Sequence, residues 1–220
     1  DFLDEYFETD VIKAALSGGG IQGTALGIYS PGTSYVLLHH AMGDVDGNMG
    51  AWGYARGGMG AIADALCKSF QSYGGEMRAE AGVEQILVKN GKVTGVALSS
   101  GEEINANIVV SGMDLKNTFL RCMDKGDLDE DFYNRVENFK SRGSSGKLNI
   151  ALNGLPTFPQ LPKNSPLLAG DLHFIDSMER LERAYDDWKD GTWSKDPYVD
   201  LVFPTLNDPT MAPPGKHFAS

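Results

Sequence analysis

The chain has 220 residues with a formal net charge of −11, and 41% of its residues are hydrophobic. Such a composition is typical of a globular protein with one large domain or parts of two. The negative charge argues against a nucleic-acid or anionic-membrane partner, and no apolar run is long enough for a transmembrane helix. Cys67 and Cys122 are too few for a disulfide framework or a metal cluster. They predict buried thiols in a reducing compartment, cytoplasm or organelle matrix.

The stretch SGGGIQG, residues 17–23, has the spacing G-x-G-x-x-G that is found in dinucleotide-binding loops. That motif requires a strand before the first glycine and a helix after it. Residues 10–16 instead have apolar side chains at helical spacing, and Pro31 leaves little room for a following helix. We therefore predict a helix that ends at these glycines, in a loop that binds no phosphate.

The adjacent residues His39 and His40 are candidates for acid–base chemistry, because an unperturbed histidine titrates near neutral pH. Neighbouring residues on a strand point to opposite faces, so at most one of the two could enter a given site. A hydrogen-bonded structural histidine is the favoured interpretation. The sequence shows no Ser-His-Asp arrangement, no zinc-ligand spacing and no paired catalytic carboxylates, so we predict no metal site.

The middle of the chain has the clearest pattern. Residues 60–73 place apolar side chains on one helical stripe, which ends at Gly74. Asn90-Gly91, between segments rich in Val and Ile, is a strong signal for a β-hairpin. The run NIVV, residues 107–110, predicts a fully buried strand. We therefore expect a helix packed on a β-meander over residues 76–111.

The remaining residues also alternate between helical and strand patterns. Residues 147–153 and 198–203 are predicted to be strands of a second, mixed sheet. A capping box, Asp176 with Glu179, predicts the start of the helix between them. Another strand is expected to begin near the C-terminal end of the chain. The predicted fold class is therefore α/β, with mixed α and β structure.

Two long runs resemble a known family: GTSYVLLHHAMGDVDGNMGAWGYARGGMGAIADAL, from Gly32, and GVEQILVKNGKVTGVALSSGEEINANIVVSGMD, from Gly82. They are similar to the phytoene desaturase-like FAD-dependent oxidoreductases, and most similar to the branch named for a pyridine nucleotide-disulphide oxidoreductase domain. The resemblance extends along essentially the whole chain. It implies an amine-oxidase-like FAD/NAD(P)-binding fold with a substrate domain built on a mixed sheet.

The resemblance also implies a division of the chain by role. Residues 1–56 match the first part of a substrate or cap region, residues 57–113 a central FAD-domain segment, and residues 114–220 a second part of the substrate domain. The family's phosphate-binding and flavin-ring segments have no counterpart in these residues. The chain is therefore expected to be an inactive central fragment that holds no FAD stably by itself. Its unpaired sheet edges are expected to favour self-association.

Some cofactor positions of the family match single residues of this chain. The backbone of Val83 matches a position that hydrogen-bonds the adenine, and a valine in the sheet core is a compatible alternative. Ser111 and Gly112 match small residues near the nucleotide, although a tight turn without ligand contact is an equal alternative. The glycines of residues 57–60 match a glycine turn, for which close helix packing is favoured over direct contact with FAD.

The family's substrate cavity is the expected location of Trp52, Tyr54 and Arg56, although such aromatic residues could equally lie in a core or an interface. The implied reaction is a two-electron oxidation of a C–C or C–N bond in an apolar, lipid-like substrate, with FAD as the hydride acceptor. A different class of function is also open. In that alternative, the chain is a non-enzymatic binding or interaction module that kept the fold without the cofactor.

Overall fold

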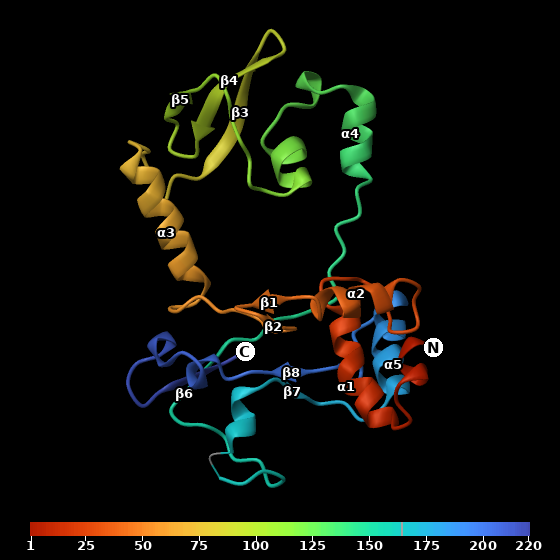
Figure 1. The fold of residues 1–220 in the computed structure, drawn as a ribbon. Coiled ribbons are helices and arrows are strands. Elements are labelled where there is room, and N and C mark those ends of the chain that lie inside the picture. The colour runs from red at the N-terminus through yellow and green to blue at the C-terminus, as the bar shows by residue number, and fades with distance from the viewer. Residues whose placement is uncertain (164) are drawn as a thin grey trace. The chain divides into compact units, whose positions relative to one another are not determined.

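The computed structural model describes residues 1–163 and 165–220, which form two compact units (Figure 1). The first unit contains Asp1–Leu66 and Arg142–Ser220, and the second contains Cys67–Ser141. Each unit contains both helices and strands, which confirms the mixed α/β class. The three-part division by role stays a prediction, because compactness by itself assigns no role to a segment.

The helices of the first unit pack around α1. Helix α1 (Asp10–Ile21) contacts both α2 (Thr33–His40) and α5 (Met178–Lys189), and the three lie side by side in Figure 1. The backbone amide that opens α5 donates a hydrogen bond of 3.1 Å to the Asp10 carboxylate. This bond joins the first turns of two helices that are far apart in the sequence.

The N-terminal cap of α5 differs from the predicted one. Ser177 is the N-cap, and its hydroxyl oxygen accepts a hydrogen bond of 3.4 Å from the Arg180 amide. The capping box therefore does not start at Asp176, although the predicted helix is confirmed. Serine is as good an N-cap as aspartate, so sequence preference alone could not separate these two neighbours.

The glycine-rich stretch lies inside α1 and not in a loop. Residues 18–20 are helical, and only Gly23, with φ of +72°, lies in the turn beyond the helix end. Gly20 faces the carbonyl oxygen of Thr33, and an added Cβ would lie 3.0 Å from that oxygen. The prediction of a loop is thus wrong for residues 18–20, because helix packing explains these glycines. A helix also occupies the place where a dinucleotide fingerprint needs a strand.

The strands of the first unit's C-terminal part form two antiparallel pairs. Strand β6 (Ile150–Leu152) pairs with β9 (His217–Ala219), and β7 (Leu172–His173) pairs with β8 (Asp200–Leu201). The prediction of one mixed sheet is wrong, although the strand expected near the C-terminal end is confirmed as β9. Each strand has only two or three residues, so the pairs depend on the core beneath them for stability.

The core of this part of the unit is built from apolar side chains of loops and strands. Phe203 is only 2% exposed and Ala219 only 1%. Leu172 and Leu201, which are register partners in the β7–β8 pair, pack against this cluster. The residues of these strands that alternate with the leucines consequently point away from the core.

The remaining part of the first unit leads into helix α3. Strands β1 (Asp44–Val45) and β2 (Asn48–Met49) form a short hairpin. Helix α3 (Met59–Ser72) confirms the helix predicted over residues 60–73. Its predicted apolar stripe is largely exposed, from 43% at Ile62 to 89% at Tyr73.

The second unit is built on a three-stranded antiparallel meander, which confirms the predicted meander over residues 83–105. The predicted packing of the helix on this meander is wrong, because the apolar side chains of α3 are largely exposed. Strand β3 (Val83–Lys89) pairs with β4 (Lys92–Leu98), which pairs with β5 (Glu103–Asn105). Asn90 and Gly91 form the turn with positive φ angles of 53° and 71°. Both residues thus have the left-handed conformation that a two-residue hairpin turn of this kind requires.

Residues 107–110 are not a strand in this structure. Ile108 is 80% exposed and Val110 is 89% exposed. The prediction of a fully buried strand is wrong here, because these residues have no strand partner among the described residues and lie beyond the end of β5. Their side chains instead give the second unit an exposed apolar segment.

The rest of the second unit consists of short helices, and the Ile86 amide of β3 donates a hydrogen bond of 2.7 Å to the Cys122 carbonyl at the end of one of them. Segment 117–121 has π-helical hydrogen bonding, and α4 (Glu130–Glu137) packs against it. The structure also has 3₁₀ turns at Phe2–Glu5, Lys125–Asp127, Pro166–Ala169, Pro204–Leu206 and Pro209–Met211. In the described part of the chain, every helix is too short or too polar to cross a membrane.

Candidate functional site

The two positions predicted to lie near the nucleotide are connected through one short segment. The Cys122 thiol donates a weak hydrogen bond of 3.9 Å to the carbonyl oxygen of Val83. The Ser111 hydroxyl lies 2.8 Å from the hydroxyl of Thr118, which precedes Cys122 by four residues on the same segment. Val83 is half-buried, whereas Ser111 and Gly112 are exposed. Segment 118–122 therefore contacts both Val83 and Ser111, and the role of all three residues in cofactor binding stays a prediction.

A hollow of about 380 Å³ lies between residues 78–81, which lead into β3, and residues 98–102. Ala81 and Leu98 line it, and Leu98 is the register partner of Val83. At its rim, Arg78 forms ion pairs of 2.7 Å with Glu76 and 2.8 Å with Glu102. Hydrogen bonding to Glu102, more than to Glu76, raises the pKa of the Arg78 guanidinium above its ordinary value. Glu80 also lines the hollow, so the charge of Arg78 is balanced there by carboxylates.

The glycine turn before α3 is held by an acidic side chain. Gly57 and Gly58 both have positive φ angles, 85° and 76°. The Gly57 amide donates a hydrogen bond of 2.6 Å to the Asp208 carboxylate, and an added Cβ at Gly58 would lie 3.1 Å from the Met211 methyl group. Hydrogen bonds from Thr210 and then from the Gly57 amide lower the pKa of Asp208. These contacts explain the two glycines by backbone conformation and packing.

The three residues predicted for the substrate cavity lie on the surface of the first unit. Trp52 is 57% exposed and Tyr54 is 82% exposed, and Arg56 is also exposed. The Trp52 indole stacks on the His40 ring at 5.6 Å between centroids and donates a hydrogen bond of 3.2 Å to the His40 carbonyl. The structure thus places Trp52 firmly, and the role of the three residues in substrate binding stays a prediction.

The histidine pair ends a helix and not a strand. His39 and His40 are the last residues of α2, so the strand argument for opposite faces does not apply to them. The ring Nδ1 of His40 lies 2.9 Å from the Gly19 carbonyl oxygen of α1. His40 is therefore a hydrogen-bonded structural residue that joins two helices, as the favoured interpretation expected.

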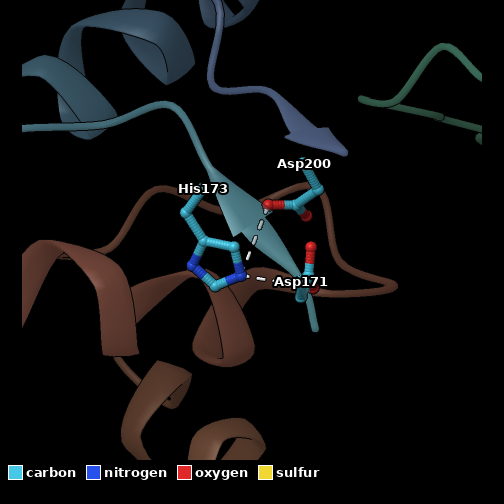
Figure 2. A group of neighbouring side chains, drawn as sticks. All are labelled: Asp171, His173 and Asp200. Atoms are coloured by element: carbon cyan, nitrogen blue, oxygen red, sulfur yellow. Dashed lines mark ion pairs between the residues drawn. The ribbon is translucent and has the colours of Figure 1, made fainter. Parts of the chain in front are cut away.

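A group of titratable side chains lies at β7 and β8, where Asp171, His173 and Asp200 converge (Figure 2). His173 and Asp200 are register partners, and Asp171 is two residues before His173 on the same chain segment. Residues two apart on a strand, and residues directly opposite across a pair, share one face of the sheet. The opposite face carries Leu172 and Leu201, which anchor the pair on the core.

The distances within this group are short. The Nε2 atom of His173 lies 3.2 Å from Oδ2 of Asp171 and 3.7 Å from Oδ1 of Asp200. One nitrogen and two carboxylate oxygens all lie within 4.8 Å of one another. The His173 side chain is 25% exposed, and the two carboxylates are 42% and 35% exposed, so solvent and ions can reach the group. We call these three residues the Asp171–His173–Asp200 group.

A second layer of contacts fixes this group. The other ring nitrogen of His173, Nδ1, lies 3.1 Å from the carbonyl oxygen of Ala15 in α1. The Tyr198 ring packs edge-on against the imidazole at 5.8 Å between centroids. Because Nδ1–H donates to the Ala15 carbonyl, Nε2 is the unprotonated nitrogen of the neutral ring.

The electrostatics of the group follow from partial burial of two negative charges. Burial raises the pKa of Asp200, and the charge of Asp171 adds to the increase. Hydrogen bonding from the Tyr198 hydroxyl counteracts part of it. Burial, and then the bond to Asp200, raise the pKa of Tyr198, so this phenol stays protonated and acts as a donor.

No sequence pattern predicted this group, because its members are not close in sequence. Asp200 is separated from His173 by helix α5, and only the register of β7 with β8 brings them together. The one local signal was the pattern Asp-Leu-His at residues 171–173, which places two polar side chains on one face of a strand. Zinc-ligand motifs with short spacings cannot detect such an arrangement.

Comparisons with known proteins identify related chains. A family model described as flavin containing amine oxidoreductase matches residues 4–180. The pyridine nucleotide-disulfide oxidoreductase domain-containing protein 2 of Rattus norvegicus is 35% identical over 99% of this chain and 39% of its own length. The neurosporene-forming phytoene desaturase of Rhodobacter capsulatus is 32% identical over 74% of this chain and 30% of its own length. The chain thus spans less than half the length of these relatives.

A solved structure supports the fold. An oxidoreductase from Methanosarcina mazei superposes with a TM-score of 0.57 over 96% of this chain and 46% of that chain. Sequence identity in this comparison is 18%, so the similarity shows the fold alone.

Proposed function

We propose a function from one premise: the chain belongs to the flavin-containing amine oxidoreductase family, with phytoene desaturases among its relatives. The observation that carries the proposal is the family match over residues 4–180, which includes the whole meander. Within that family the complete protein is an FAD-dependent oxidoreductase. In it, this chain supplies one edge of the FAD site and part of the region that positions the substrate.

The residues beside β3 fit the adenine end of FAD. The hollow beside the loop that leads into β3 is lined in part by Ala81 and Leu98, and its volume of about 380 Å³ can admit a planar ring system. Backbone groups at the start of the strand would hydrogen-bond the ring edge. A neutral ring such as adenine suits this lining, because Arg78 is already paired with Glu76 and Glu102. Ser111 and Gly112 are small enough to let the nucleotide approach.

The stretch at residues 17–23 does not fit the pyrophosphate of FAD. Its glycines are helical from Gly18 to Gly20 and face neighbouring protein atoms, so their amides are used within α1. A phosphate cradle needs amides that point outward at a helix start. We therefore assign the pyrophosphate-binding role to residues outside this stretch.

When bound, FAD supplies the hydride acceptor for oxidation of a C–C or C–N bond. The residues of this chain then position the substrate and exclude water from it. Trp52 and Tyr54 suit an apolar substrate, because large aromatic faces bury much apolar surface at little entropic cost. The relative named as a phytoene desaturase supports a substrate of this apolar class.

In this proposal, the chain alone is inactive and does not retain FAD. The 39% share of the rat relative supports this, since much of that protein lies outside the matched segment. One or two backbone hydrogen bonds to adenine contribute about 1 kcal/mol each. Ordering costs of association are about 4 kcal/mol or more. The exposed apolar segment at residues 107–110 also favours partners, among them a second copy of the chain.

The free thiols suggest where such a protein works. Cys67 is partly buried and Cys122 is buried, and neither forms a disulfide. We propose a reducing compartment, cytoplasm or organelle matrix, as the location, because cysteines in an oxidising compartment are commonly paired in disulfides.

Flavin content tests this function directly. The purified chain should be colourless after incubation with FAD, whereas the complete protein should carry bound flavin and show its visible absorption band. In the complete protein, Val83→Pro should strip the flavin, because proline removes the backbone N–H while remaining tolerated at the first residue of a strand.

The matched control is Val83→Ala, which keeps the backbone N–H and should keep the flavin. Equal flavin in both variants would refute the role of Val83. A complete protein without any flavin would favour the non-enzymatic binding module instead. Stoichiometric flavin on the chain alone would contradict the proposed division of the FAD site.

A further inference from the structure

The Asp171–His173–Asp200 group presents only hydrogen-bond acceptors when its histidine is neutral. The Ala15 carbonyl takes the Nδ1–H of His173, so the lone pair on Nε2 points toward two carboxylates (Figure 2). Three acceptor atoms within 4.8 Å of one another repel unless a cation lies between them. Either a proton on Nε2 or a metal ion can supply that positive charge.

The distances suit a small metal ion. For a tetrahedral ion with ligand distances of about 2.0–2.1 Å, neighbouring ligand atoms lie about 3.3–3.4 Å apart. The two distances from Nε2, 3.2 Å to Asp171 and 3.7 Å to Asp200, lie on either side of this value. Small side-chain rotations would therefore complete three ligands and leave a fourth position open to solvent, because all three side chains are partly exposed.

The surrounding contacts are those that metal-binding histidines and carboxylates use. A metal-bound histidine commonly donates its other ring N–H to a backbone carbonyl, as His173 does to Ala15. The Tyr198 ring packs edge-on against the imidazole at 5.8 Å between centroids. The Ala15 carbonyl belongs to α1, so the orientation of the imidazole is fixed from outside the β7–β8 pair. This second layer distinguishes the group from a chance cluster of surface carboxylates.

We propose that Asp171, His173 and Asp200 bind one divalent transition-metal ion, with the imidazole nitrogen selecting it over Mg²⁺ and Ca²⁺. One nitrogen and two oxygen ligands suit Zn²⁺ and its first-row neighbours, whereas Mg²⁺ and Ca²⁺ require mostly oxygen ligands. The formal charge of −11 on the chain further favours cations near its surface. The ion would tie β7 to β8 and stabilise the short pair.

Zinc and cobalt are the probes for this site. With Zn²⁺ at about 100 times its dissociation constant, the melting temperature of the full chain should rise by about 5–10 °C. Equilibrium dialysis should give one ion per chain, and Co²⁺ should show the visible absorption band of a tetrahedral N/O site. Mg²⁺ at the same concentration should produce neither effect.

Variants separate this site from adventitious binding. His173→Gln should abolish the Co²⁺ band and the zinc-dependent rise in melting temperature. The controls His39→Gln, an exposed histidine outside the group, and Asp176→Asn, an exposed carboxylate nearby, should bind like the wild type.

Asp171→Asn provides a second test if His173→Gln fails to fold, because Asp171 is exposed and its loss leaves the core intact. It should also lose the Co²⁺ band. Zinc binding that is absent in the wild type, or equal in the wild type and Asp171→Asn, would overturn the proposal. In that case the group is a protonated histidine paired with two carboxylates.

Discussion

The Tyr198 hydroxyl lies directly against the backbone of Gly18, in the space that a Cβ atom would occupy at any other residue. This contact joins the segment before β8 to helix α1. It also holds Tyr198 where it can approach Asp200 and the imidazole of His173. Gly18, which matches the first glycine of the nucleotide-binding motif, therefore leaves room for the Tyr198 side chain.

Gly18→Ala should destabilise the chain by about 1–3 kcal/mol, because the new methyl group would overlap the Tyr198 hydroxyl. Chemical unfolding would measure the loss. The double variant with Tyr198→Phe should lose less than the sum of the single changes, since the hydroxyl is then absent. Gly60→Ala in α3, where a Cβ meets no atom within 4 Å, is the control and should stabilise by about 0.5–1 kcal/mol. If Gly18→Ala also stabilises the chain or leaves its stability unchanged, this packing role is contradicted.

Gly20→Ala should reduce stability without changing the amount of flavin per folded complete protein. The added Cβ would lie 3.0 Å from the Thr33 carbonyl oxygen, so the cost falls on the packing of α1 against α2. Unfolding curves and flavin absorbance of the same preparation measure the two effects separately. Loss of flavin from folded protein would mean that residues 17–23 do contact the cofactor.

Lysine at Ile108 or Val110 should reduce self-association of the chain. The side chains are 80% and 89% exposed, so the free energy of unfolding should change by no more than about 0.5 kcal/mol. A charge in an exposed apolar segment opposes edge-to-edge pairing. Analytical ultracentrifugation would compare these variants with Leu148→Lys, which alters an apolar side chain that is 71% exposed in the first unit. If all three variants associate equally, residues 107–110 are not the contact.

Protonation of Asp208 at low pH should break its hydrogen bond with the glycine turn before α3. The Asp208 pKa is lowered by hydrogen bonds from Thr210 and Gly57. A carboxyl group whose pKa is lower when folded stabilises the fold above its unfolded pKa of about 3.9, and this stabilisation disappears as pH falls through the folded pKa. The NMR shift of the Gly57 amide should therefore titrate below about pH 3.9 in the wild type and stay constant in Asp208→Asn. A midpoint above that value would contradict the contact.

Local signals in the sequence predicted local structure well. Asn90-Gly91 required only its own two residues to specify the hairpin turn, and the stripe from Ile62 to Tyr73 specified its helix. Residues 107–110 show the limit of such signals. An apolar run indicates that a strand would be favourable, but whether it forms depends on a partner strand that the run itself does not encode.

The candidate sites also differ in how far local sequence patterns predict them. Val83 could be placed at a strand start from the pattern around it, and the structure confirms that position. The Asp171–His173–Asp200 group depends on register between two strands separated by a helix, and on the Ala15 carbonyl of a third element. Such long-range pairings follow from the core beneath Leu172 and Leu201, and the spacing of residues in the sequence does not predict them.

The glycines of α1 affect how the first unit should unfold. Each glycine costs about 1 kcal/mol of helix propensity relative to alanine, so residues 18–20 would not stay helical in isolation. Their helix persists because α2, α5 and Tyr198 surround it. The last turn of α1 should thus unfold together with those neighbours, and its amides should exchange with deuterium at the same rate as theirs. This glycine-rich turn makes the helices and the β8 segment a single cooperative unit.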